Sequence, residues 1–296
     1  MILSMTGFGR GVASSSSKKI TIEIKSLNSK QFDLTMRVPS YFKEIEVEAR
    51  NYIGSRMERG KTDLSASVEY VGDEAPVQIN EAVVSNYKRQ IEELGIRLGI
   101  GAPQDWFGVL MRMPDTFRSD VSGVGKDDIE AFHEACSAAV DALEEFRATE
   151  GRKLYDFFVG KIKNLGALLD GIEPYEAERV PKIKARIEEQ LSRLDSIEID
   201  KGRLEQEMIF YIEKLDVTEE KTRLRTHLAY FLDTMGERQG DRAPQGQGKK
   251  LGFIAQEMGR EINTLGSKSN HAEMQKIVVM MKDELEQIKE QVLNVL

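Results

Sequence analysis

Several features that define common protein classes are scarce or missing in this sequence of 296 residues. It contains one cysteine, Cys136, so the chain can form neither an internal disulfide framework nor a cysteine-based metal cluster. No apolar run approaches the roughly 20 residues of a membrane-spanning helix. The first residues also do not combine a basic segment with an apolar core, as a secretory signal does. We therefore expect a cytoplasmic protein that has no membrane partner.

Positive charge is in the minority as well. The chain has 42 lysine and arginine residues against 50 aspartate and glutamate residues, which gives a formal net charge of −8. This balance argues against a protein that is coated in positive charge and binds nucleic acid without specificity. It leaves RNA binding open, because a local basic surface can bind phosphates. The local basic clusters are Arg56, Arg59 and Lys61, and Arg238, Arg242, Lys249 and Lys250, and both could equally be solvated charge.

Alternating apolar and polar residues predict strands in the first part of the chain. Residues 20–24, 34–38 and 64–70 have this period of two, and the glycine-rich segment at 1–13 suits an edge or bulged strand. We expect the strands at 20–24 and 34–38 to form a hairpin or to be antiparallel neighbours. Strands interleaved with helices on such a sheet predict an α+β domain at the N-terminus.

The rest of the chain has the apolar period of helices. The predicted helices are residues 41–57, 80–98, 127–172, 179–194, 205–235, 249–270 and 272–296. Several are long and highly charged with thin apolar stripes, which indicates partner helices in this chain or in other subunits. The fold class is therefore α+β: an antiparallel-type sheet with helices, then a long-helix arm and a mostly α-helical C-terminal domain. The predicted domains are 1–155 for the α+β domain, which also mediates oligomerisation, 156–202 for the arm, and 203–296 for the helical domain.

The helix predicted at 249–270 has an unusual polar face. Its apolar stripe consists of Ile254, Met258, Ile262 and Leu265, and the residues that share another face are Glu257, Arg260, Glu261 and Thr264. The Ser267-Lys268-Ser269 segment follows. A compact block of carboxylates and basic groups beside such a segment suits the binding of a cation or a phosphate. The alternative is an ordinary helix surface whose ion pairs contribute a few tenths of a kcal/mol each.

A second helix, at 205–235, carries a matching face. The residues on it are Asp216, Glu219, Glu220, Arg223 and His227, and the packing stripe is Leu224, Leu228 and Phe231. Two such helices side by side would form an oxygen-rich site with one imidazole, which suits Mg²⁺ or Mn²⁺ better than a structural Zn²⁺. His227 could instead be an ordinary histidine on the surface of a helix.

Motifs at both ends of the chain belong together. In chain order they are Ser4-Met5-Thr6-Gly7-Phe8-Gly9-Arg10; Arg203-Leu204-Glu205-Gln206-Glu207; Asp216, Glu219, Glu220, Arg223, Leu224 and His227; Phe253, Ile254, Gln256, Glu257, Arg260, Glu261, Asn263, Thr264 and Gly266 to Ser269; and Glu290-Gln291-Val292-Leu293-Asn294. This set resembles the YicC-like endoribonuclease family over nearly the whole chain. It departs from the family pattern at Gly252, where an aspartate is expected, and in a long loop rich in Gln and Gly at 236–248.

The resemblance implies metal-dependent endonucleolytic cleavage of RNA in single-stranded or loop regions. It also implies a homo-oligomer, in the form of a hexameric ring. Residue type and helical register then assign the roles. The predicted ligands of Mn²⁺ or Mg²⁺ are Asp216, Glu220, His227, Glu257 and Glu261. The predicted catalytic residues are His227, Glu257 and Glu261, and the predicted RNA- and phosphate-binding residues are Arg223, Arg260, Lys268, Lys249 and Lys250.

Other interpretations fit the same pattern. The loop at 236–248 joins the two site helices, and it could be a lid, an RNA-gripping flap or a tolerated surface insertion. The whole protein could be a non-catalytic RNA-binding chaperone or adaptor. It could also be a helical scaffold in which the charged faces are ion pairs between subunits. Carboxylate-to-amide substitutions distinguish the nuclease from the chaperone, because in a nuclease they abolish cleavage and leave binding intact. A scaffold predicts instead that Glu257→Gln or His227→Ala disrupts assembly.

Overall fold

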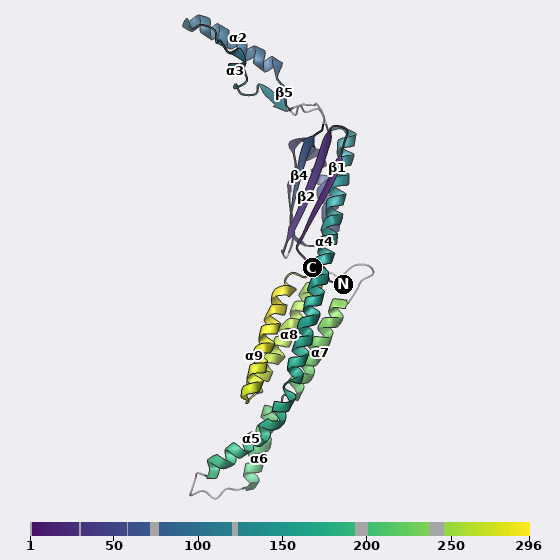
Figure 1. Cartoon of the computed structure of the whole chain (residues 1–296), viewed down its shortest axis with the longest axis vertical. Coiled ribbons are helices and arrows are strands. Elements are labelled where there is room, and N and C mark those ends of the chain that lie inside the picture. Colours follow the sequence, from purple (N-terminus) through teal and green to yellow (C-terminus); the bar gives the residue numbers. More distant parts are fainter. Residues whose placement is uncertain are drawn as a thin grey trace.

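The computed structural model describes residues 2–29, 31–57, 59–71, 77–119, 124–192, 201–236 and 246–296 of the chain. The molecule is elongated, and a sheet and a helical bundle are arranged along one helix of 45 residues, α4 (Lys126–Asp170) (Figure 1). The fold class is α+β, as the sequence predicts. The strands are β1 (Gly7–Ser14), β2 (Lys18–Leu27), β3 (Phe32–Arg37), β4 (Gly60–Tyr70), β5 (Val77–Ile79) and β6 (Phe117–Ser119). The other helices are η1 (Ser40–Ile45), α1 (Glu46–Arg56), α2 (Glu81–Leu98), α3 (Trp106–Leu110), α5 (Glu173–Ser192), α6 (Lys201–Leu215), α7 (Thr218–Gly236), α8 (Gln247–Lys268) and α9 (Ala272–Val292).

The main sheet is mixed, with the strand order β1-β2-β4-β3. β2 is antiparallel to both β1 and β4, whereas β3 pairs with β4 in parallel. The prediction that residues 20–24 and 34–38 form a hairpin or antiparallel neighbours is therefore wrong, because β4 lies between β2 and β3. The helical segment η1–α1 carries the chain back across the sheet, and such a crossover joins parallel strands. Alternation of apolar residues marks a strand but does not reveal its neighbour.

β1 lies directly on α4 because its inward-facing positions are glycines. An added Cβ at Gly9 would overlap the carbonyl oxygen of Ala139, and one at Gly11 would overlap that of Ala135. Gly7, two residues earlier, faces Leu143 in the same way. Because these positions carry no side chains, β1 can approach the helix backbone closely, as interior glycines often permit.

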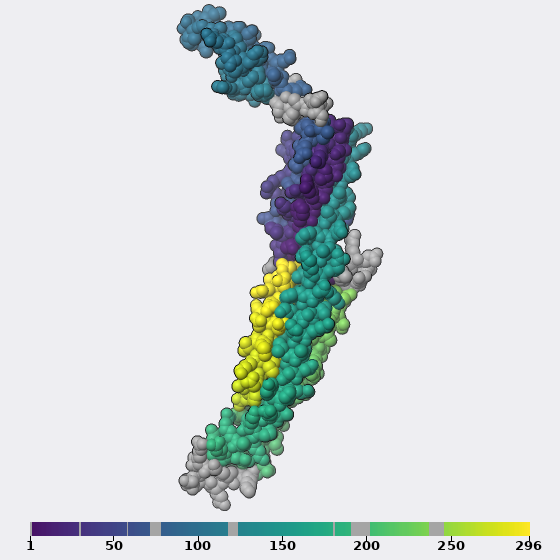
Figure 2. Space-filling model, in the orientation of Figure 1, coloured from purple at the N-terminus to yellow at the C-terminus, as the bar shows by residue number. Residues whose placement is uncertain are grey.

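α4 contributes to two separate cores. Its first part packs against the sheet and α1, where Phe132, Ala139 and Leu143 are fully buried. Its last part, from Phe158 to Leu169, packs with α7, α8 and α9 in a second core. Figure 2 shows α4 as a continuous band beside both parts of the molecule. The predicted division at residue 155 falls within this uninterrupted helix.

The two ends of the chain meet between the cores. Ser4 and Val295 form an antiparallel bridge, flanked by the hydrogen bonds from Met5 N to Asn294 O at 2.8 Å and from Leu296 N to Leu3 O at 2.9 Å. The C-terminal residues also touch the start of α8, where an added Cβ on Gly248 would overlap the Val295 carbonyl oxygen. The contact between the termini thus holds α8 against the sheet domain.

Two predicted helices have different bounds in the structure. The helix expected at 205–235 is divided into α6 and α7 at Asp216, and the helix expected at 249–270 begins at Gln247 and ends at Lys268. Of the predicted loop at 236–248, residues 237–245 lie outside the described residues. None of the helices that the structure describes has the length and apolar content to cross a membrane.

A buried ion pair lies at the end of the sheet where β2 begins. Lys18 Nζ lies 2.5 Å from Oδ2 of Asp128, and Ser15 Oγ donates to Asp128 Oδ1 at 2.6 Å. Burial alone would raise the pKa of Asp128, but the hydrogen bonds from Lys18 and Ser15 outweigh it and hold the pKa below its ordinary value. Asp128 lies in the first turn of α4, so this pair ties the start of the helix to the start of β2.

The close contact between β1 and α4 can be tested with Gly9→Ala. The added methyl group has no room against the α4 backbone, so we expect the free energy of unfolding in urea to fall by about 2–3 kcal/mol. Gly160→Ala is the matched control, because this α4 glycine has no neighbouring atom within 4 Å. It should leave stability unchanged or raise it by up to about 1 kcal/mol. Equal effects of the two substitutions would contradict the packing described here.

The Lys18–Asp128 pair predicts a pH dependence of stability. Because the pKa of Asp128 is lower in the folded protein, its stabilisation is present above about pH 4 and is lost as the pH falls through the folded value. We expect Asp128→Asn to lower the free energy of unfolding at pH 7 by about 3 kcal/mol, and the deficit to shrink in acid. Asp141→Asn removes an exposed partner of Arg56 and should change stability by less than about 1 kcal/mol. A deficit that is independent of pH would argue against this role.

Candidate functional site on α7 and α8

The two predicted site helices, α7 and α8, are antiparallel neighbours. Gln247 Nε2 donates to Thr234 O at 2.5 Å near one end, and Lys268 Nζ lies 2.8 Å from Glu220 Oε1 near the other. The predicted apolar stripes of both helices are buried, including Ile262 and Phe231 at 0% exposure. The predicted polar residues therefore lie along the other side of this helix pair. We call this side, with Asp216, Glu220, Arg223, His227, Glu257, Arg260, Glu261 and Lys268, the α7–α8 face.

Glu220 is the most buried charged group of the α7–α8 face. Its side chain is 6% exposed, and Oε1 pairs with Lys268. Oε2 is buried and has no hydrogen-bond partner among the described residues. A buried carboxylate oxygen without a partner is costly, so it is a place where a further ligand would be stabilised.

Asp216 starts α7. Its Oδ1 accepts hydrogen bonds from Thr218 N at 3.0 Å and from Thr218 Oγ1 at 2.7 Å. These two bonds, with a smaller contribution from the charge of Lys268, lower the pKa of Asp216. The carboxylate therefore satisfies the orphan donors of a helix start, which explains why the chain begins a new helix here.

Arg223 and Arg260 each pair with a carboxylate on their own helix. Arg223 Nη2 lies 2.6 Å from Glu219, and its Nη1 lies 4.0 Å from Glu261 on α8. Arg260 Nη1 lies 2.7 Å from Glu257. Both guanidinium groups are more than half exposed. They are open to a phosphate from solution, and as ion pairs they add little stability.

His227 lies one helical turn after Arg223, and its side chain is half-buried. Within the described residues, its ring makes no hydrogen bond or ion pair. Gly252, where the family pattern suggests an aspartate, faces Val292 of α9. It therefore lies away from the α7–α8 face, and the glycine removes no group from it.

Lys249 and Lys250 lie at the opposite end of α8 from Lys268. Lys268 lies 18 positions after Lys250, which corresponds to about 27 Å along the helix. Lys250 Nζ lies 5.0 Å from the ring centroid of Tyr230, and Lys249 Nζ lies 5.9 Å from that of Phe253. The predicted basic residues thus span the whole α7–α8 face instead of gathering around one point.

Comparison with known proteins bears on both parts of the chain. The family model described as "Endoribonuclease YicC-like, N-terminal region" matches residues 2–156, and the one described as "Endoribonuclease YicC-like, C-terminal" matches residues 172–296. The chain belongs to the YicC-like endoribonuclease family. A relative from Clostridioides difficile (strain 630), named "Probable endoribonuclease YicC", is 30% identical over 299 residues and is covered completely, as is this chain. A relative of the same name from Haemophilus influenzae is 27% identical over 303 residues, with 99% of each chain covered.

The donor groups of the α7–α8 face do not form a complete metal site within this single chain. Across the described residues, no three histidine, cysteine, aspartate or glutamate side chains come close enough to hold one metal ion. Glu220 and Glu257 each have a basic partner instead. The buried Oε2 of Glu220 is the feature that would favour an additional cation. Mg²⁺ is commonly held by one or two carboxylates, and water and substrate phosphates complete its ligands. An incomplete set of protein ligands is therefore compatible with a Mg²⁺ site, and the predicted ligands of this YicC-like chain stay a prediction.

Arg179 of α5 holds the end of this face, and no sequence pattern indicated that role. Its side chain is buried, with Nη2 donating to Leu215 O at 2.6 Å and Nη1 donating to Lys268 O at 3.2 Å. These carbonyls belong to the last residues of α6 and α8, which have no partner within their own helices. One guanidinium therefore joins two helix ends next to Asp216 and Lys268.

We expect Arg179→Ala to loosen both helix ends. Loss of two charged hydrogen bonds should lower the free energy of unfolding by about 3 kcal/mol and speed amide hydrogen exchange around residues 215 and 268. Arg179→Lys should have an intermediate effect, because an ammonium group cannot reproduce the planar fork. Arg225→Ala, which removes an exposed pair with Asp170, is the control and should cost less than about 1 kcal/mol. Unchanged exchange at both helix ends would rule out this positioning role.

Proposed function

We propose that this protein is an endoribonuclease that cleaves phosphodiester bonds in single-stranded or loop regions of RNA, and that the α7–α8 face is its site. One observation carries the assignment to this face: three basic side chains alternate with three carboxylates on it, beside an imidazole. The basic residues are Arg223, Arg260 and Lys268, and the carboxylates are Glu220, Glu257 and Glu261. The names of both relatives support the reaction class.

The basic residues are suited to contact and orient the RNA backbone. A guanidinium group can donate two parallel hydrogen bonds to a phosphate, so exposed Arg223 and Arg260 are suited to orient the scissile group. Lys268 adds a positive charge where negative charge develops on the phosphate oxygens during cleavage. The backbone bond from Arg179 fixes the end of the helix that carries Lys268.

His227, Glu257 and Glu261 are the proposed acid–base residues. An imidazole can accept or donate a proton near neutral pH, and the ring of His227 is not engaged by another described residue. Glu257 lies on the facing helix and is 41% exposed, so it can reach a bound strand. Glu261, at 12% exposure, is positioned deeper and can hold the orientation of Arg223.

Divalent-metal dependence is part of this proposal, with Mn²⁺ or Mg²⁺ as the ion and the five predicted residues as its ligands. It is supported by the carboxylates of the face and by the partnerless Oε2 of Glu220. Removal of the ion with EDTA tests the dependence directly.

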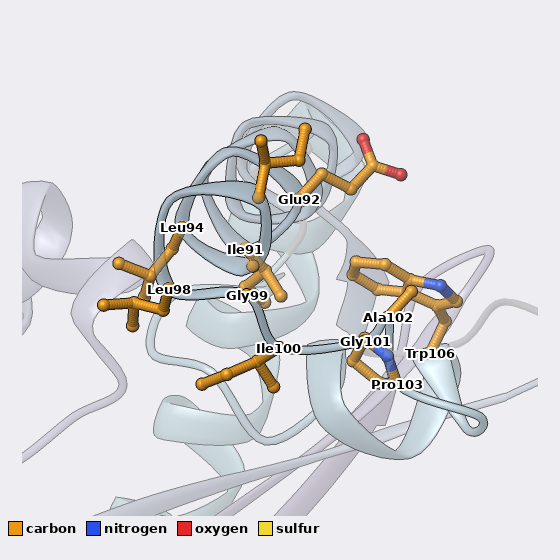
Figure 3. Close-up of a pocket in the computed structure, with 12 residues that line it drawn as sticks. Ile91, Glu92, Leu94, Leu98, Gly99, Ile100, Gly101, Ala102, Pro103 and Trp106 are labelled. Atoms are coloured by element: carbon orange, nitrogen blue, oxygen red, sulfur yellow. The ribbon is translucent and has the colours of Figure 1, made fainter.

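We also propose a cytoplasmic homo-oligomer, the hexamer that the family resemblance implies. Large apolar side chains are exposed on α6, with Ile209 and Phe210 at 58% and 62%, and on α2 and α3, with Ile96 and Phe107 at 85% and 78%. Mostly apolar residues of α2 and of the segment that follows it line a hollow of about 720 Å³. Figure 3 shows these residues. Exposed apolar surface of this kind is typical of protein contacts.

The nuclease proposal predicts internal cuts in an end-labelled hairpin RNA incubated with the full chain and Mn²⁺ or Mg²⁺, and none with EDTA. Glu257→Gln and His227→Ala should each slow cleavage by about 100-fold or more, because each removes a proton-transfer group. The native mass of both variants should be unchanged in sedimentation. Glu273→Gln is the matched control, since Glu273 forms the same kind of exposed pair, with Lys276 on α9 at 2.8 Å.

Other outcomes of this experiment identify the competing functions. RNA that is bound but stays intact under every metal would favour the chaperone. Loss of assembly in Glu257→Gln, with no cleavage by the unaltered protein, would favour the scaffold. Cleavage that continues in EDTA would contradict the metal dependence alone.

A further inference from the structure

Two aromatic side chains point into solvent at one end of the α7–α8 face. Tyr230 of α7 is 44% exposed and Phe253 of α8 is 59% exposed. Their sequence neighbours Phe231 and Ile254 are buried in the core of the bundle, with exposures of 0% and 5%. The core of the bundle is therefore formed by the neighbours of the two rings, and about half of each ring-bearing side chain stays open to solvent.

Each ring has a lysine beside it. The Nζ atom of Lys250 lies 5.0 Å from the centroid of the Tyr230 ring, and that of Lys249 lies 5.9 Å from the centroid of the Phe253 ring. Both distances are in the range of cation–π contacts, which place positive charge over the face of an aromatic ring. We call Tyr230, Phe253, Lys249 and Lys250 the aromatic–lysine patch.

The patch is continuous with the proposed acid–base residues. Tyr230 follows His227 by three residues on α7, and Phe253 precedes Glu257 by four residues on α8. Residues at these spacings share one side of a helix and lie about one turn, roughly 5.4 Å, apart. The two rings therefore belong to the same side of the helix pair as the groups that would act on RNA.

We infer that the aromatic–lysine patch is a stacking platform for the bases of an unpaired RNA strand, with the two lysines binding its backbone. The inference rests on the proposed function. Exposed aromatic rings beside positive charge are the usual combination for binding single strands, since every base has a face that can stack. In a duplex the base faces are covered by neighbouring base pairs, so the patch selects unpaired segments.

The charge of the patch favours RNA over a second copy of the chain. In the patch, each exposed ring lies next to a lysine. On α6, by contrast, the exposed apolar residues Ile209 to Ile212 follow one another in sequence. A polyanion with aromatic bases complements both properties of the patch at once. If the patch were a subunit contact instead, its loss would lower the native mass of the protein.

The test uses the full-length protein and a fluorescent single strand of 2′-O-methyl RNA, which resists cleavage, with 2-aminopurine at one position. The unaltered protein should bind it and quench the 2-aminopurine as the base stacks. Tyr230→Ala and Phe253→Ala should each weaken binding by roughly five- to hundredfold and remove part of the quenching. Tyr230→Phe and Phe253→Tyr keep a ring and should bind as the unaltered protein does. Phe146→Ala, which removes an exposed ring on α4, should also have no effect.

The outcomes separate this inference from the proposed nuclease activity. Weaker binding by the alanine variants with unchanged native mass supports the platform, whether or not the protein also cuts hairpin RNA. Normal binding and quenching by both alanine variants would overturn the platform and leave the nuclease proposal intact. A fall in native mass would overturn it in favour of a subunit contact. No binding of the single strand by the unaltered protein would overturn both proposals.

Discussion

The structure depends on the direct contact between the backbone of β1 and α4. Gly9 and Gly11 leave no space for a Cβ against Ala139 and Ala135, so strand and helix lie closer than side chains would allow. The first core lies where the first part of α4 packs against the sheet and α1. The second core lies where the last part of the same helix packs against α7, α8 and α9. Because α4 is unbroken between them, its alignment on β1 also sets the direction of the helical bundle. A glycine-rich strand at the N-terminus thus influences a site more than 200 residues later in the chain.

The contact between the chain termini also helps to fix the helical bundle relative to the sheet. The bridge between Ser4 and Val295 lies beside the start of α8, and Gly248 accommodates the C-terminal backbone there. At the other end of the face, Arg179 ties the last carbonyl groups of α6 and α8 together. The α7–α8 face is therefore supported at both ends by hydrogen bonds from distant parts of the chain. Such support is what a site needs if its groups are to keep a fixed geometry.

Helical register predicted which sides of α7 and α8 are buried, but local patterns could not predict the contacts that these helices make with distant parts of the chain. Apolar periodicity identified the buried sides of both helices, so the polar residues on the other side followed. The break at Asp216 was missed because a capping aspartate has the same helical spacing as a surface one. The parallel pairing of β3, the bridge between the termini and the role of Arg179 are all contacts between residues far apart in sequence. The aromatic residues Tyr230 and Phe253 were overlooked because an aromatic in a helix is usually assigned to a core.

An acidic chain can bind a polyanion when its negative charge is compensated near the binding surface. On the α7–α8 face Glu220, Glu257 and Glu261 each lie within 4.0 Å of a basic group, and charges farther away than about 10 Å are largely screened at physiological salt. A phosphate that takes Arg260 or Arg223 must, however, compete with the carboxylate already there, so these pairs contribute little net affinity. In the described part of the chain, Lys249 contacts the Phe253 ring and no carboxylate. Affinity for a strand should therefore reside mainly in the aromatic–lysine patch, and reactivity in the paired groups one turn away.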